Sequence, residues 1–394
     1  MTTVNTEIFL KHQSSINCRE FFIINWKSWK LLGIIVPERD VPNHLQHIIW
    51  NYFINITVTC MFPIHLMLGI FITEATKSEL FENVAIFITS VGAILKLIMF
   101  AINMKNIIKM EQILQSLDER IQHADDQLYY TQHIKRHLIY VQRMYIVVYA
   151  AIGFFASLAF IARGEQKLFY PGWLPFNWHQ SWWHYSAALG YQLYGIFFQI
   201  LQNFANDSFS PKALCSLSGH IQLLYKRVAR IGYDTPVMSQ ENEMELNRCV
   251  THQKDLYELF DTIQEIISWP MFFQLFVSLS NMCVAMVALL FFVTDIFYRI
   301  YYVMYFLGMI MQLFPVCYYG SDFVILFEKL HYAVFSCNWT GESKRFKRHM
   351  MLFTERSLKM SMAMAGGMFP IHLTTFFATC KGAYSMFAVV ITMK

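Results

Sequence analysis

The chain has 394 residues, of which 56% are hydrophobic and 15% charged, and its formal net charge is +4. Soluble domains carry about 25% charged residues, so this composition excludes an ordinary water-soluble protein and indicates a polytopic membrane protein. The eight cysteines fall within apolar runs or in segments expected in the cytosol, which predicts reduced thiols rather than disulfides. Residues 1–44 lack the apolar run of a signal peptide, so we expect a cytosolic amino-terminal segment.

Seven apolar stretches are long enough to cross a bilayer, whose hydrocarbon core of roughly 30 Å requires about 20 apolar residues in a helix. The predicted spans are 46–71, 79–103, 139–162, 183–206, 268–293, 297–319 and 371–393. Gly366, Gly367 and Pro370 precede the last span and interrupt any helix arriving from upstream. The sequence therefore predicts an all-α membrane protein with seven transmembrane helices, the last helix being split into a cytosolic and a membrane half.

Lysine and arginine are distributed unequally between the two sides of these spans. One side holds 24 of them, whereas the other holds five: Lys77, Arg163, Lys167, Arg299 and Lys394. Because basic residues favour the cytosolic side, the amino terminus is expected inside the cell and the carboxyl terminus outside. This orientation is the reverse of that of a G-protein-coupled receptor, and the DRY and NPxxY motifs of that class are absent. A secondary transporter would favour broken helices in two repeats, but only one break is found.

The predicted cytosolic segments carry apolar stripes at helical spacing. One stripe follows span four, a second precedes span five, and a third follows span six. Their residues are Leu214, Leu217, Ile221, Leu224, Val228 and Ile231; Leu256, Leu259, Phe260, Ile263 and Ile266; and Phe346, Met350, Phe353 and Met362. Packed together, these stripes would form a helical bundle below the membrane and a candidate site of subunit contact.

Aromatic and small polar residues gather in the outer halves of spans two, three, four and six. Such walls suit a small, mostly apolar ligand, although tyrosines at the end of a span are more often interfacial anchors. The candidate ligand-binding residues are Phe87, Ser90, Gly153, Phe154, Ser157, Tyr191, Tyr194, Tyr302, Tyr305 and Phe306.

The last span carries a polar stripe of Thr374, Lys381, Ser385 and Thr392. Such a stripe faces either a neighbouring helix or a water-filled pore, and periodicity alone favours neither. Val389 and Met393 adjoin it and suit a hydrophobic constriction, although on spacing alone ordinary packing is the better explanation.

The remaining polar residues and motifs indicate neither a metal site nor an enzyme. Lys96 of span two is expected to reach the cytosolic surface with its long side chain rather than form an ion pair. His133 and His137 are spaced to share a metal ion, but no nearby ligand completes a site and a solvated helix is the better interpretation. Nucleotide-binding and hydrolase motifs are missing, so neither an enzyme, nor a cofactor, nor a nucleic-acid partner is expected.

The carboxyl-terminal stretch from Cys337 to Lys394 contains CNW, RFKRHMMLF, AGGMFPI and GAYSMFAVV. Together with YPGWLPFNW before span four and DSFSPKALCSLSGHIQLL at its end, it resembles the insect odorant receptors over nearly the whole chain. The resemblance implies an odorant-gated, nonselective cation channel in which a ligand-tuning subunit forms a tetramer with the odorant co-receptor (Orco), in the plasma membrane of olfactory neuron dendrites. A volatile odorant, membrane lipid and permeant cations are the implied partners.

The resemblance also implies roles for particular segments. Residues 1–44 would be the cytosolic amino-terminal segment, and 45–319 the first six transmembrane helices, with 207–267 as a cytosolic extension. Residues 320–366 would form anchor helices, and 367–394 the pore-lining half of helix seven. Carried over from the family, Ser90, Gly153, Ser157, Tyr194, Tyr302 and Tyr305 would line the odorant pocket. Ser385 and Thr392 would line the pore, and Val389 and Met393 would form its gate.

Two features place the chain among the tuning subunits. The related gustatory receptors, an alternative within the same superfamily, usually end in a TY and QF motif, whereas the terminal AYSMFAVVITM here has no glutamine. The co-receptor carries a long insert between spans four and five, for which residues 207–264 leave little room. A tuning subunit is therefore the expected assignment.

Overall fold

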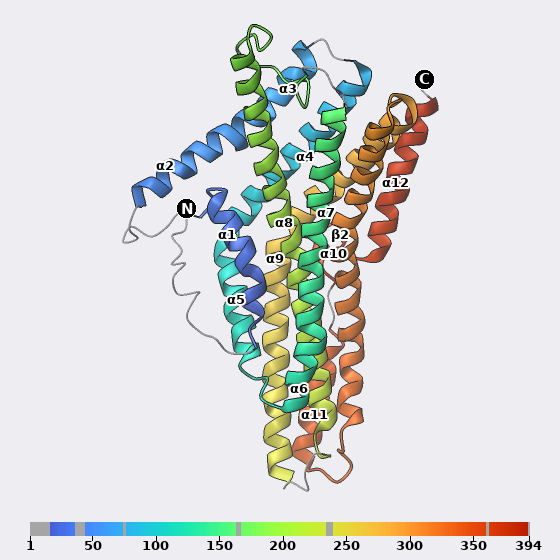
Figure 1. Cartoon of the computed structure of the whole chain (residues 1–394). Coiled ribbons are helices and arrows are strands. Elements are labelled where there is room, and N and C mark those ends of the chain that lie inside the picture. Colours follow the sequence, from blue (N-terminus) through green and yellow to red (C-terminus); the bar gives the residue numbers. More distant parts are fainter. Residues whose placement is uncertain are drawn as a thin grey trace.

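The computed structural model describes residues 16–35, 44–73, 76–162, 167–233, 239–359 and 362–392. The described chain is almost wholly helical (Figure 1). The amino-terminal elements are η2 (Cys18–Phe22), α1 (Ile23–Leu31), α2 (His44–Ile54), η3 (Asn55–Met61), α3 (Phe62–Ile72), α4 (Lys77–Ile102), α5 (Met104–Asp118), α6 (Ala124–Tyr129) and η4 (Tyr130–Ile134). The remaining elements are α7 (Lys135–Ala162), α8 (Trp182–Arg230), α9 (Ser239–Phe291), α10 (Ile296–Ser336), α11 (Lys344–Ser357), β1 (Met364–Ala365), β2 (Phe369–Pro370) and α12 (Leu373–Thr392).

Polar side chains at the starts of several helices explain where these elements begin. Thr76 and Glu79 form a reciprocal capping box at the start of α4. Ser181, Asp295 and Ser343 accept hydrogen bonds from the first turns of α8, α10 and α11. Each cap satisfies backbone N–H groups that have no partner within the helix.

Six helical stretches among the described residues are long and apolar enough to cross a membrane, and they coincide with six of the predicted spans. They are His44–Ile72, Glu79–Ile102, Ala124–Ile161, Gln240–Phe291, Ile296–Ser336 and Leu373–Thr392. The remaining predicted span, 183–206, is the outer part of the 49-residue helix α8, which runs through the same bundle (Figure 1). The prediction of an all-α, seven-helix membrane protein is thereby confirmed.

The low hydropathy of the outer part of α8 has a structural cause. Gln192, Gln199, Gln202 and Asn203 lie on this helix and are all buried. They face neighbouring helices rather than lipid, and Gln199 donates to the Ile86 carbonyl of α4 (3.3 Å). Gln192 and Asn203 are hydrogen-bonded as well. A helix that is enclosed by protein can carry such amides, because neighbouring groups offer hydrogen-bond partners.

The lower half of the bundle has the most extensive core. The apolar stripes predicted on α8 and α9 are buried along their whole length, as are Phe346, Met350 and Phe353 of α11. Met362, in contrast, is exposed. Because the stripes pack against one another within one chain, any contact between subunits must use other side chains; subunit contact in this region stays a prediction.

The predicted break before the last span is a two-stranded hairpin. Strands β1 and β2 pair antiparallel, and Gly366 and Gly367 turn the chain with φ angles of 58° and 70°. A side chain at Gly366 would meet the ring of Phe272 at 2.6 Å, whereas Gly367 faces open space. Glycine is thus required at Gly366 both by its backbone conformation and by close packing.

Candidate functional site

A cavity of about 310 Å³ lies in the outer half of the bundle among α4, α7, α8 and α10. These helices contain predicted spans two, three, four and six. Aromatic side chains form much of its wall, and Thr89, Ser157 and Gln199 add polar groups. The other lining residues are Ile86, Tyr149, Ile152, Gly153, Ala156, Phe169, Tyr170, Leu193, Ile196, Phe197, Ile200, Asn203, Tyr301, Tyr305, Met309 and Gln312. The volume lies at the lower end of the range for small-molecule sites.

An outer loop covers this cavity. Gln192 of α8 donates to the Tyr170 carbonyl (2.9 Å) and accepts from the Tyr170 amide (3.3 Å). His65 Nδ1 lies 2.6 Å from the Trp173 carbonyl, and Asn83 donates to the Pro171 carbonyl (2.9 Å). The loop that contains the YPGW motif is therefore held between three helices, and it places Phe169 and Tyr170 over the cavity.

The deep end of the cavity meets a buried polar ring, by which we mean Lys96, Tyr149, Asp207, Gln274 and Gln312. Lys96 Nζ contacts Asp207 Oδ1 (2.5 Å) and Gln274 Oε1 (2.6 Å). Tyr149 donates to Asp207 Oδ2 (2.5 Å) and accepts from the Gln312 amide (2.6 Å). Gln274 donates to Gln312 Oε1 (3.2 Å), which closes the ring.

The buried polar ring corrects one prediction from the sequence. Lys96 does not reach the cytosolic surface: its side chain is 3% exposed and forms an ion pair with Asp207. The partner residue lies 111 positions away in the sequence, on a helix whose packing against α4 the sequence does not reveal. A buried charge requires such compensation, because desolvation without a partner costs several kcal/mol.

The ten candidate ligand-binding residues do not share one environment. Gly153, Ser157 and Tyr305 line the cavity, and Tyr305 is hydrogen-bonded to Thr89 (3.0 Å). Phe87 and Tyr191 pack near Phe62, outside the cavity lining, while Phe306 packs beside the cluster that contains the buried Tyr302. Ser90 is also buried, and Tyr194 is hydrogen-bonded to Thr57 (2.9 Å). Phe154 is 63% exposed. Contact of these ten residues with a ligand stays a prediction.

Helix α12 packs one face against α9 and α10 and leaves the other uncovered. Phe376, Thr379, Ala383 and Phe387 form the buried face. The predicted polar stripe of Thr374, Lys381, Ser385 and Thr392 is exposed, as is Val389. Ser385 and Thr392 donate to carbonyls of their own helix. Helix α12 lies at the edge of the bundle (Figure 1), and a pore-lining role for its exposed face stays a prediction. Met393 lies outside the described residues.

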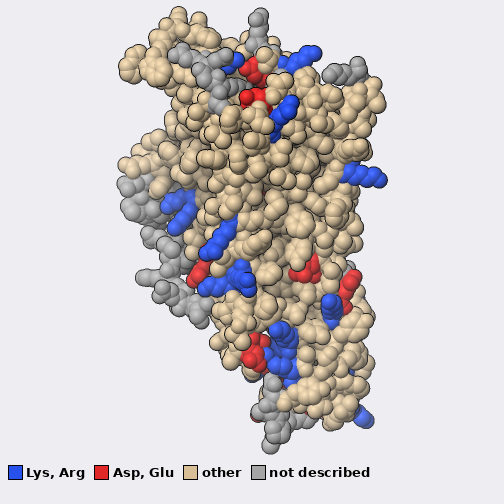
Figure 2. Space-filling view, turned by 45° about the vertical axis from the view of Figure 1, so that its right-hand side comes forward, with Lys and Arg blue, Asp and Glu red and all other residues tan. Residues whose placement is uncertain are grey.

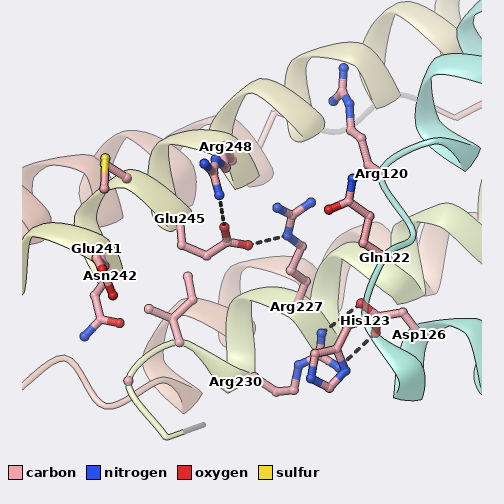
Figure 3. A pocket seen from close by; sticks show the side chains of 13 residues that line it. Arg120, Gln122, His123, Asp126, Arg227, Arg230, Glu241, Asn242, Glu245 and Arg248 are labelled. Carbon is pink, nitrogen blue, oxygen red and sulfur yellow. Dashed lines mark hydrogen bonds and ion pairs between the residues drawn. The ribbon is translucent and has the colours of Figure 1, made fainter. Parts of the chain in front are cut away.

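A larger, charged cavity of about 650 Å³ lies at the opposite end of the bundle, between α6, α8 and α9. Figure 3 shows Arg227 and Arg248 both pointing at Glu245, with contacts of 2.5 and 3.4 Å. Arg230 contacts both carboxylate oxygens of Asp126 (2.9 and 2.8 Å). Although burial opposes ionisation of Glu245, the hydrogen bond from Arg227 holds the pKa of that carboxyl below its ordinary value. Arg227 and Arg230 join α8 to α9 and to α6, whereas Arg248 pairs within α9. A lining of such charged groups does not suit an apolar ligand.

Comparison with known proteins gives a consistent result. The model of the 7tm odorant receptor family matches residues 76–384. The chain belongs to the odorant receptor family. Odorant receptor 59a of Drosophila melanogaster is 37% identical over 96% of this chain and 98% of the relative. Odorant receptor 23a of the same species is 32% identical over 94% and 95%.

Solved structures agree with this assignment at the level of the fold. The insect olfactory receptor OR5 from Machilis hrabei, solved in complex with eugenol, superposes on this chain with a TM-score of 0.74. The match covers 96% of this chain and 98% of the OR5 chain, at 15% sequence identity. A structure of the same receptor described without eugenol also has a TM-score of 0.74. The resemblance seen in the sequence is confirmed: the protein is a multi-pass membrane receptor of the odorant receptor family, neither an enzyme nor the co-receptor.

Sequence reasoning missed the polar residues at the deep end of this receptor's cavity. Tyr149, Asn203 and Gln312 all line it, yet none was a candidate. The available signal was the presence of Gln312, Asn203 and Gln274 inside apolar runs, because an amide at membrane depth has to face protein or water. Their meeting at one place depends on how α8, α9 and α10 pack.

Proposed function

We propose that this receptor is the odorant-binding subunit of a ligand-gated, nonselective cation channel formed with the odorant co-receptor. The observation that supports the proposal most directly is the cavity among α4, α7, α8 and α10. It is small, its wall is mostly apolar, and the YPGW loop covers it, as expected for a site that takes up a volatile molecule. A solved structure of the same fold contains eugenol, which is also a small organic molecule.

The chemistry of the cavity favours a particular class of ligand. Phe169, Tyr170 and Tyr301 offer aromatic rings, while Asn203 and Gln312 present amides at the deep end. A small molecule with an apolar body and one hydrogen-bonding group, such as an ester, ketone, aldehyde or phenol, matches this distribution. An odorant without a polar group would leave the amides without an additional partner, and it would bind less tightly.

The buried polar ring offers a route from the cavity to the pore helix. Tyr149 and Gln312 belong to both the cavity lining and the ring, and Gln274 extends the ring to α9. Helix α9 packs against α12, where Phe291 and Phe387 are 6.2 Å apart. A ligand that moves α9 and α10 would therefore change the support of α12 and open a constriction at Val389 and Met393. Taking a gate from mostly shut to mostly open requires about 5.5 kcal/mol of differential affinity across the assembly.

Current recording tests the proposal. Cells that express this receptor, the co-receptor or both are exposed to a panel of small odorants, and surface expression is measured in parallel. We expect an odorant-evoked cation current only with both chains. If both chains reach the surface and no odorant in a broad panel evokes a current, or if the response equals that of the co-receptor alone, the proposal is overturned.

A further inference from the structure

Three potential metal ligands meet in the cytosolic half of the receptor. Cys18 is the first residue of η2, Asp118 the last residue of α5, and His220 lies in α8. The thiol, one carboxylate oxygen and one ring nitrogen all lie within 4.8 Å of one another, and all three residues are buried. They are separated by 100 and 202 positions in the sequence, so only the fold brings them together.

Two of the three distances within this group match those around a tetrahedral zinc ion, and the third is within 4.8 Å. The Cys18 Sγ atom lies 3.7 Å from His220 Nε2, and the same nitrogen lies 3.3 Å from Asp118 Oδ1. Zinc bonds of about 2.3 Å to sulfur and about 2.0–2.1 Å to nitrogen and oxygen separate such atoms by roughly 3.6 Å and roughly 3.3 Å at the tetrahedral angle. The side chains need little movement to hold one ion between them.

The hydrogen bonds of this group leave a buried oxygen atom without a partner. His220 Nε2 faces both a thiol and a carboxylate oxygen, but one ring nitrogen carries either one hydrogen or one lone pair. Asp118 Oδ1 has no hydrogen-bond partner among the described residues, although it is buried. The other oxygen, Oδ2, accepts from the Cys18 amide (2.7 Å), which fixes the carboxylate with Oδ1 directed at His220.

We propose that Cys18, Asp118 and His220 bind a zinc ion that fastens the amino-terminal segment to α5 and α8. A thiolate, a carboxylate and a neutral imidazole would balance the charge of a divalent ion, which matters in a site without solvent. Sulfur and nitrogen ligands favour zinc over magnesium or calcium, which prefer oxygen. The fourth position is open to water or to Tyr130, whose hydroxyl accepts from the neighbouring Asn17 amide (3.2 Å). The proposal departs from the expectation, drawn from the sequence, of no metal.

The metal content of the purified receptor tests the proposal. The full chain is purified with the co-receptor by an affinity tag that contains no histidine, in buffers without chelator, and zinc is measured per mole of protein. We expect about one zinc per copy of this chain above the content of co-receptor purified alone. Cys18→Ser should remove it. Cys249→Ser replaces another buried cysteine outside the group and should retain it.

A second measurement covers the case in which Cys18→Ser fails to fold. The wild-type complex is stripped with a mild chelator and titrated with Co²⁺, and absorption is recorded against co-receptor alone. Tetrahedral cobalt bands with a thiolate charge-transfer band, both displaced by Zn²⁺, are the expected result. Absence of these bands, wild-type zinc at background, or undiminished zinc in folded Cys18→Ser would overturn the proposal.

Discussion

Tyr305 and Phe154 are both aromatic residues in the outer half of a predicted span, yet they lie in different surroundings. Tyr305 lines the cavity and is hydrogen-bonded to Thr89. Phe154 belongs to the helix that contributes Gly153 and Ser157 to the cavity, but its own ring points outward and is largely exposed. A helix places successive side chains about 100° apart, so the residue next to a cavity residue can face lipid.

Replacing Tyr305 by alanine should therefore impair the odorant response, whereas Phe154→Ala should not. We expect the half-maximal odorant concentration to rise about tenfold or more for Tyr305→Ala, which corresponds to about 1.4 kcal/mol of lost binding. Concentration–response curves with the co-receptor, corrected for surface expression, provide the measurement. Equal effects of the two substitutions would contradict the cavity as the ligand site. Tyr302→Ala is not a comparable test, because Tyr302 packs in the same cluster as Tyr305 but does not line the cavity.

Substitutions of Lys96 and Asp207 should have strongly coupled effects on the unfolding free energy. Lys96→Met leaves the Asp207 carboxylate buried without its cation, so we expect a loss of about 3–5 kcal/mol of unfolding free energy. Adding Asp207→Leu removes the remaining charge and should restore part of the loss, although Tyr149 also loses an acceptor. Melting temperatures of the detergent-solubilised single and double variants measure the coupling. Additive effects would show that the pair contributes no interaction energy.

Lys212 is a second buried lysine, located on α8 beyond the predicted inner end of its span. It donates to the Phe21 carbonyl (2.8 Å) and to Asn25, and it has no carboxylate partner among the described residues. Burial lowers the pKa of Lys212 to about 7 from its ordinary 10.5. Between these two values the unfolded chain binds the proton and the folded chain does not, so the unfolding free energy rises with pH in this window.

Stability should accordingly depend on pH through Lys212. The wild-type unfolding free energy should rise by up to about 1.4 kcal/mol per pH unit relative to Lys212→Met between pH 7.5 and 9.5. Melting temperatures in detergent across this range report the slope, whatever the absolute stability of the variant. Lys226→Met, on the same helix but half-buried, serves as the control and should keep the wild-type slope. If Lys212→Met kept the wild-type slope, Lys212 would not be the source of the pH dependence.

At the scale of elements, α8 and α12 show how packing changes the interpretation of a sequence pattern. Amides lower the hydropathy of α8, but they are buried against neighbouring helices. The polar stripe on α12 is exposed instead, and the hydroxyls of Ser385 and Thr392 bond only within their own helix. Among the described residues, neither hydroxyl bonds to a neighbouring helix, as expected for a face that lines the proposed pore.

Cysteine substitution on α12 should separate its two faces. Ser385→Cys places a thiol on the exposed face, and Ala383→Cys places one against α9 and α10, where Ala383 is buried. In the channel formed with the co-receptor, a charged methanethiosulfonate reagent applied from outside should reduce the odorant-evoked current of Ser385→Cys. It should leave Ala383→Cys at the level of the unsubstituted receptor. The same inhibition in both variants would contradict a pore face at Ser385.

At the scale of the whole molecule, charged side chains are distributed unevenly along the bundle. On the face shown in Figure 2, most lysine and arginine side chains lie in the lower half, beneath a band with few charged groups. The long helices α8, α9 and α10 continue from that band into the lower half without a break (Figure 1). The boundaries predicted at 207, 267 and 320 therefore do not coincide with helix ends.

The number of membrane crossings and the distribution of basic residues predict which terminus antibodies can reach. An odd number of crossings places the two ends of the chain on opposite sides of the membrane, with the more basic side in the cytosol. We expect an amino-terminal epitope tag to stain only in permeabilised cells and a carboxyl-terminal tag to stain in intact cells. Staining of the amino-terminal tag in intact cells would contradict the topology.

The amino-acid sequence by itself determined the membrane class, seven spans, their orientation, the break at Gly366 to Pro370 and the apolar stripes of the lower bundle. Each of these follows from local composition or periodicity, because lipid and water select residues according to the surface they touch. Only the tertiary structure decided that Lys96 pairs with Asp207, that Tyr305 faces a cavity while Phe154 faces outward, and that Cys18 meets His220. These contacts join residues about 100 to more than 200 positions apart. Which side chains meet depends on the rotation of each helix about its axis, and packing against several neighbours at once sets that rotation.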